Sequence, residues 1–184
     1  MDRRGLLLAL GVTACSLFEA KRAAATTARA LTLPELVGRS QSVFLATPLA
    51  RNASWMEVGG ARRIVTETRA RVEELVAGAD PESSEVIFHT LGGQVGKIGQ
   101  LVEGEADLVL RETSLLFGRR IEQAVFSVAA MAQGHYPLAT ERGERIVRPS
   151  PNLPVLLGRT GSAVARLSGR PLAEARGLVR GEQR

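Results

Sequence analysis

Residues 63–76 constrain the fold of this chain most, because apolar and charged side chains alternate along them. The side chains on the apolar face are Ile64, Thr66, Thr68, Ala70 and Val72. Successive side chains of a strand point to opposite faces, so a period of two is typical of a half-buried β-strand. A bulge near Glu74 would let both Leu75 and Val76 contact apolar groups. We therefore predict a long strand here, with one face in the core.

Four other segments have the length and composition of strands, and residues 77–82 between two of them have turn composition. The segments are residues 42–47, 85–91, 107–117 with an interruption near Glu112, and 123–131. Strands at this spacing are typical of a small barrel or a two-sheet sandwich. We predict a mainly β fold built as a barrel of about five strands, with the sandwich as the alternative.

The last third of the chain changes character. Three prolines, at positions 149, 151 and 154, predict an extended passage, and the composition from Gly161 onward predicts a helix with Pro171 in a first turn. We expect this helix to dock on the barrel with a solvated basic face, or to present that face to an anionic partner. The chain then divides into a signal peptide (1–30), a barrel domain (31–140) and a proline-rich passage with a C-terminal helix (141–184).

The N-terminus has the pattern of a bacterial export signal. A short basic segment ending in Arg3 and Arg4 precedes an apolar run over residues 5–18. That run is shorter than the roughly 20 residues that span a bilayer, but suits the core of a signal peptide. Ala28 and Ala30 form a small-x-small site, which predicts cleavage before Leu31. The paired arginines resemble a twin-arginine signal, with the general secretory route as the alternative, and the protein is expected in the periplasm or outside the cell.

Cys15 allows two interpretations. Residues 12–15 resemble a lipobox, in which this cysteine would be acylated and would anchor the protein to a membrane. We favour the other interpretation, a small apolar residue inside an ordinary signal core, because the apolar run continues past Cys15 to Phe18. A buried N-terminal helix would be a third possibility, but the charges of Lys21 and Arg22 argue against it.

The composition excludes several classes of site. The chain has one cysteine, which excludes a disulfide framework and any multi-cysteine metal site. Aromatic residues make up 4% of the sequence, which argues against a surface that stacks bases or sugars. The formal net charge is +5, yet Arg69 and Arg71 lie among acidic residues instead of forming a basic patch. We predict no cofactor and no nucleic-acid partner.

Residues 92–100 hold the densest local signal, a glycine-rich segment with a Gly-Lys pair. A phosphate-binding loop needs four residues between its first glycine and that pair, followed by Ser or Thr. Here three residues intervene from Gly92, and Ile98 stands at the hydroxyl position. We interpret the segment as a glycine-shaped turn that offers a contact surface. Its candidate contact residues are Gly92, Gly93, Gln94, Gly96, Lys97 and Gly99.

Other candidate chemistry is weak. Glu103, Glu105 and Asp107 would share one face of a strand, where they could bind a hard cation or simply keep a sheet edge from associating, and we favour the second. His89 lies in an apolar strand and is interpreted as a ring at the edge of the core. The sequence has no Gly-x-Ser-x-Gly nucleophile elbow, so we favour a protein that is not an enzyme and leave a dispersed catalytic site open.

Four segments carry a resemblance to known domains: SVFLA at 42–46, RIVTETRARVEELVAG at 63–78, VIFHTLGG at 86–93 and LLF at 115–117. Their order resembles a bacterial secreted domain of uncharacterised function. It is also similar to the barrel of netrin modules and of tissue inhibitors of metalloproteinases, and this implies an OB-like barrel, of the oligonucleotide/oligosaccharide-binding type. Those inhibitors chelate their target's zinc with an N-terminal cysteine. The mature chain expected here begins at Leu31 without a cysteine, so their mechanism is not implied.

The expected function follows from export, the barrel and the absence of a catalytic motif. We expect a non-catalytic binding or accessory module of the cell envelope, whose partner is an envelope protein or a glycan. Contact with the membrane would be through the signal peptide or a lipid on Cys15 alone. A secreted hydrolase with a dispersed site and a single-strand nucleic-acid-binding module are the alternatives.

Overall fold

The computed structural model describes residues 27–183, so Cys15 and most of the expected signal peptide lie outside the described residues. The strands are β1 (Thr27–Arg29), β2 (Ser42–Val58), β3 (Ala61–Gly78), β4 (Glu85–Leu91), β5 (Gly93–Val95), β6 (Ile98–Gln100), β7 (Ser114–Glu122), β8 (Val125–Val128), β9 (His135–Glu141), β10 (Glu144–Val147) and β11 (Val155–Leu157). The helices are α1 (Leu33–Gly38), the 3-10 helix η1 (Met131–Gly134), α2 (Ala163–Leu167) and α3 (Leu172–Gly181). No helix among the described residues is long and apolar enough to cross a membrane.

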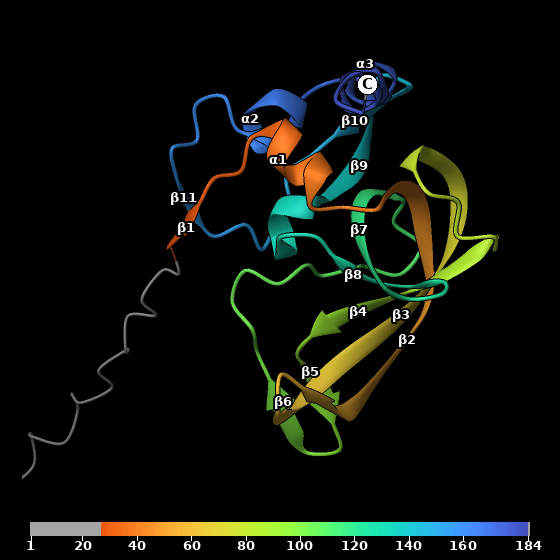
Figure 1. Ribbon diagram of the computed structural model, residues 1–184, viewed down its shortest axis with the longest axis vertical. Coiled ribbons are helices and arrows are strands. Elements are labelled where there is room, and N and C mark those ends of the chain that lie inside the picture. The colour runs from red at the N-terminus through yellow and green to blue at the C-terminus, as the bar shows by residue number, and fades with distance from the viewer. Residues whose placement is uncertain (1–26, 184) are drawn as a thin grey trace, which may run out of the picture.

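Five strands close into a ring in the order β2, β3, β4, β8, β7 and back to β2. β4 and β8 run parallel, and every other neighbouring pair of the ring is antiparallel. This is the Greek-key arrangement of an OB-type barrel. The hairpin of β9 and β10 extends the sheet from β7. The structure confirms the predicted mainly β fold, with a small five-stranded barrel and a C-terminal helix (Figure 1).

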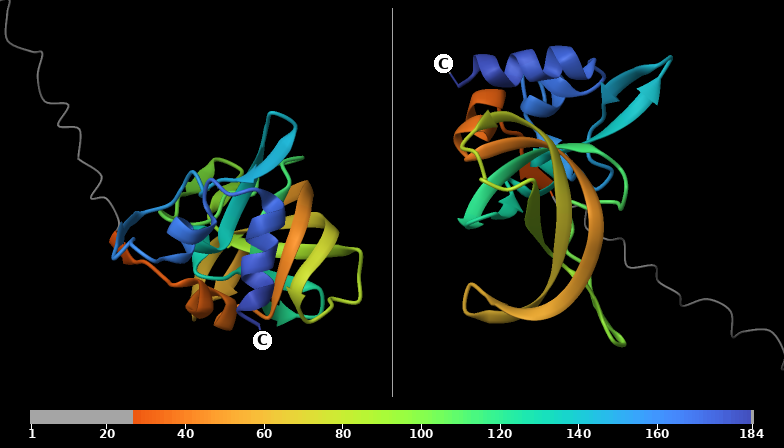
Figure 2. Two further views of the ribbon diagram at one scale, coloured as in Figure 1. Left: turned by 90° about the horizontal axis from the view of Figure 1, so that it is seen from above. Right: turned by 90° about the vertical axis from the view of Figure 1, so that its right-hand side faces the viewer.

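The predicted long strand is β3, which pairs along its whole length with β2. The two form a curled hairpin that reaches away from α3 (Figure 2). Its turn consists of Gly59 and Gly60, both with positive φ, as a two-residue hairpin turn requires. Register shifts occur on both sides of Glu74, where a bulge was predicted. Leu75 consequently packs against the barrel interior and Val76 against the helices.

Two hydrophobic cores hold the fold together. Inside the barrel, Phe44, Phe88 and Phe126 pack with ring centroids 4.9 to 6.1 Å apart. The second core lies between the barrel and the helices, and it receives alternate residues of β2 and β7, such as Val43 and Phe117. Because residues 42–48 and 114–118 are buried on both faces, their sequences read as continuous apolar runs.

The C-terminal helix α3 docks through Leu172, Ala175 and Val179, which are buried in the second core. Its basic face is paired more than the sequence suggested. The carboxylate of Glu74 accepts from Arg176 at 2.5 Å and from Arg180 at 2.8 Å. These ion pairs tie the helix to β3.

One predicted strand was largely wrong, since residues 107–113 form no strand and β7 begins at Ser114. Ala106 and Leu108 nevertheless point into the barrel core while their neighbours do not, which gives the segment a strand-like burial pattern without a paired strand. The strand predicted over 123–131 ends at Val128, because Ala130 and Met131 adopt positive φ. Helix α1, whose N-terminus carries a capping box of Thr32 and Glu35, was not predicted.

Candidate functional site

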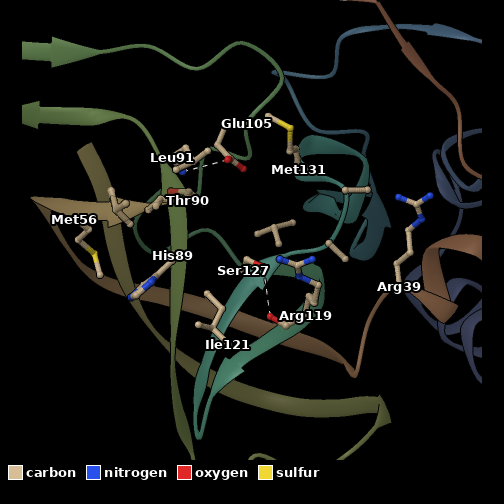
Figure 3. Close-up of a pocket in the computed structure, with 15 residues that line it drawn as sticks. Arg39, Met56, His89, Thr90, Leu91, Glu105, Arg119, Ile121, Ser127 and Met131 are labelled. Atoms are coloured by element: carbon tan, nitrogen blue, oxygen red, sulfur yellow. Dashed lines mark hydrogen bonds between the residues drawn. The ribbon is translucent and has the colours of Figure 1, made fainter. Parts of the chain in front are cut away.

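A pocket of about 540 Å³ opens on the outer face of the barrel, between the curled hairpin and the β7–β8 hairpin (Figure 3). Its large apolar lining residues are Met56, Val58, Val65, Leu91, Ile121 and Met131. Its polar and charged lining residues are Arg39, His89, Thr90, Glu105, Arg119 and Ser127. In OB folds, ligands bind on the face of the second and third barrel strands, beside the loops that flank it. β3 and β4 are those strands here.

The strand registers bring the polar residues together. His89 on β4 is paired with Ser127 on β8, and Ser127 is paired with Arg119 on β7, so the three form a row across the sheet. Paired residues of neighbouring strands share a face. Phe88 and Phe126, one position away, point into the barrel. The alternation that fills the core therefore also sets this row on the outside.

The parallel pairing of β4 and β8 ends at His89 and Ser127. Beyond these two residues the strands are no longer paired, and the pocket extends between them. There the backbone N–H of Leu91 donates to Glu105 Oε2 at 3.1 Å instead of to a strand. The N–H of Ala106 donates to Glu105 Oε1 at 3.0 Å. Burial raises the pKa of Glu105, although both backbone hydrogen bonds oppose that rise. A carboxyl group thus closes the exposed end of β4.

Two cationic side chains, Arg39 and Arg119, line the same pocket. Neither forms an ion pair with a carboxylate among residues 27–183. Figure 3 shows Arg39 at the end of the pocket away from Met56 and His89. Guanidinium groups beside an apolar surface can bind a ligand that has both an anionic group and an apolar part.

His89 lies on the outer face, half-buried, and its Nε2 is 3.1 Å from Glu67 Oε1. It is therefore a lining residue of the pocket as well as a partner of β3. The sequence predicted a ring at the edge of the core. Its place in one row with Ser127 and Arg119 follows only from the strand register. No sequence pattern indicated Arg39, Arg119 or the two methionines, because they come from distant segments.

Five of the six predicted contact residues lie in the β5–β6 hairpin, whose turn is Gly96 and Lys97, and the sixth, Gly92, is a buried link between β4 and β5. Its glycines have structural reasons: a Cβ at Gly93 would lie 2.5 Å from Thr66 Oγ1, and Gly96 has a φ of +60°. Gln94, Gly96, Lys97 and Gly99 are exposed. The hairpin packs against the side of β3 that carries Thr66, opposite to Val65 in the pocket. Its role as a contact surface stays a prediction.

The three carboxylates at positions 103, 105 and 107 do not share a strand face, because their segment is not a strand. Asp107 pairs with Arg51 at 3.0 Å, and Glu105 caps β4. Among the described residues, no group of three His, Cys, Asp or Glu side chains could hold a metal ion.

His135 is a second histidine site, and it is buried between two serines. Ser114 Oγ lies 3.2 Å from its Nε2, and Ser150 Oγ lies 3.0 Å from its Nδ1. Burial lowers the pKa of His135 to about 4, while the charge of Asp107 acts in the opposite direction. The ring is 2% exposed and does not line the pocket, so it acts as a structural hydrogen-bonding group.

No protein-family model matches this chain, and a search of curated proteins gave no match. The resemblance to netrin modules and metalloproteinase inhibitors stays a prediction.

Proposed function

We propose that this protein is an exported, non-catalytic binding or accessory module of the bacterial cell envelope, and that the barrel-face pocket binds an acidic, apolar segment of another envelope protein. The observation that carries the proposal is the pair of arginines, Arg39 and Arg119, that line an apolar pocket without an ion-pair partner among residues 27–183. Export is supported by the sequence pattern of the leader alone.

The lining favours a peptide over a rigid small molecule. Met56 and Met131 are flexible and polarisable, and methionines are common on surfaces that accommodate varied side chains. Met131 is 37% exposed and Ile121 is 48% exposed, so apolar area is available to a partner. An Asp, a Glu or a terminal carboxylate next to an apolar side chain would satisfy both the arginines and this surface.

A glycan or a nucleic acid fits the pocket less well. Both are commonly bound by stacking on the rings of Phe, Tyr or Trp, and none of these three residue types is among the described residues that line this pocket. Phe44, Phe88, Phe117 and Phe126 are all fully buried, as the sequence suggested. The ring of Trp55 lies 5.2 Å below the guanidinium carbon of Arg62 and outside the pocket lining. We therefore favour the protein partner of the two that the sequence left open.

A hydrolase is the second candidate, because Glu105 combines a raised pKa with a place in the pocket. Such groups can act as general acids. Turnover of peptide, ester or glycoside substrates by the pure protein, lost in Glu105→Gln, would establish this alternative.

The binding proposal is tested by selecting displayed random peptides on the intact protein. We expect enrichment of peptides with an acidic residue beside apolar ones. A synthetic version of an enriched peptide should lose about tenfold or more in affinity in Arg119→Glu and in Arg39→Glu, the equivalent of about 1.4 kcal/mol. Arg159→Glu is the matched control, because Arg159 is exposed and outside the pocket. Enrichment of neutral or basic peptides, or equal binding by all variants, would contradict the proposal.

A further inference from the structure

The junction between Ala30 and Leu31 is built into the folded protein. β1 pairs in parallel with β11, and the N–H of Ala30 donates to Leu157 O at 2.9 Å. Ala30 is 7% exposed and Leu31 is 4% exposed. The side chain of Gln133 holds both sides of the junction: its Oε1 accepts from the N–H of Leu31, and its Nε2 donates to Arg29 O.

Cleavage before Leu31 would disturb this arrangement in three ways. It would remove β1 and expose more of β11, whose Val155 and Leu157 are already 56% and 62% exposed. It would remove the carbonyl that the buried Gln133 amide donates to. It would also turn the buried N–H of Leu31 into a charged ammonium group, and burying an unpaired charge is strongly unfavourable. Gln133 offers that ammonium only a neutral oxygen.

An upstream site avoids all three effects. Residues Ala23, Ala24 and Ala25 also have the small-x-small form that signal peptidase recognises. A cut before Thr26 keeps β1 complete. It also places the new ammonium before Thr27, which is exposed. The cut is made on a chain that is still being exported, so the folded structure determines the stability of the product and not the accessibility of the bond.

We infer that signal peptidase cleaves this protein between Ala25 and Thr26, and that residues 27–30 belong to the mature protein as its first strand. This inference rests on the proposed export and is independent of the proposed partner.

The test is expression of the full chain with a C-terminal tag in a bacterial host, followed by intact mass and N-terminal sequencing of the protein from the envelope fraction. We expect the N-terminus to be Thr26. Ala25→Leu should abolish the Thr26 N-terminus, and any protein that is still processed should begin downstream, at the second small-x-small site of Ala28 and Ala30. The matched control Ala24→Leu, at the position that tolerates large side chains, should be processed normally.

Several outcomes would overturn the inference. An N-terminus at Arg29 or Leu31, with Ala25→Leu processed normally, would overturn the site and leave export standing. An acylated N-terminus at Cys15 would also overturn it. Uncut protein beginning at Met1 in the cytosol would overturn both the site and export, so the two failures are distinguishable.

Discussion

Lowering the pH is expected to destabilise this protein through His135. The ring is buried between Ser114 and Ser150, and burial lowers its pKa from 6.5 to about 4. The unfolded chain therefore binds a proton more readily than the folded chain in this range. The contribution of His135 is fully present above its unfolded pKa and is lost as the pH falls towards its folded pKa.

The size of the effect follows from these two pKa values. Linkage gives a loss of about 2 kcal/mol in the free energy of unfolding between about pH 7 and about pH 5. The shifted pKa values of Glu105 and Glu35 also affect how stability depends on pH, and they determine which pH range isolates His135. The raised pKa of Glu105 makes its contribution increase as the pH falls, so it opposes His135. Hydrogen bonds from Thr32 and Arg29 lower the pKa of Glu35 to about 2, so its contribution is lost only below 4.5.

The assay is urea unfolding at both pH values for the wild type, His135→Gln and Gln94→Ala. The wild type should lose about 2 kcal/mol, less the opposing contribution of Glu105. His135→Gln should lose much less over the same interval, whatever its absolute stability. Gln94→Ala is the control, because Gln94 is exposed and its side chain carries no titratable group, and it should keep the wild-type dependence. An unchanged pH dependence in His135→Gln would refute the reasoning.

Two further pairs of substitutions test which contacts stabilise the fold. Glu74→Gln should lower the free energy of unfolding by about 1 kcal/mol in chemical denaturation, because it breaks the pairs with Arg176 and Arg180. Arg176→Gln should cost less, since it breaks one of them. Equal stability of Glu74→Gln and the wild type would mean that α3 docks by apolar contact alone. Gly93→Ala should cost at least about 2 kcal/mol, because its Cβ would lie 2.5 Å from a threonine hydroxyl at a φ of +126°. Gly96→Ala, in open space, should cost about 1 kcal/mol, and the reverse order in thermal unfolding would contradict the packing described.

Alternation of apolar and polar residues in the sequence predicted much of the barrel. The same pattern failed where alternate side chains are buried but the backbone pairs with no strand. Residues 64–72 alternate because β3 has a core on one side and partners on both edges. Residues 106–108 alternate too, since Ala106 and Leu108 fill the barrel interior, but no strand pairs with them. Alternation reports which side chains are buried, while a strand also needs a neighbouring backbone. A short stretch of sequence shows which of its side chains are buried. Which backbone lies beside it depends on the topology of the whole chain.

The pocket could not have been predicted residue by residue. Arg39 follows a short helix, and Arg119 lies on β7, far away in the sequence. They line one pocket because Gln41, two residues after Arg39, binds β7 on both sides of Arg119, through Gly118 O and the N–H of Arg120. The glycine-rich hairpin was predicted as a contact surface because its glycines form a recognisable pattern. Close packing explains Gly93, however, and the turn explains Gly96. The pocket is lined instead by side chains that belong to no sequence motif and that the strand register brings together.

The most direct test of the binding proposal is a two-dimensional amide spectrum of the isotope-labelled intact protein during titration with an enriched acidic peptide. The proposed site predicts that the largest shifts occur at pocket positions, among them Leu91, Ile121, Ser127 and Met131, and that they disappear in Arg119→Glu. Shifts confined to the β5–β6 hairpin, with the pocket amides unchanged, would contradict the pocket and favour the hairpin as the contact surface.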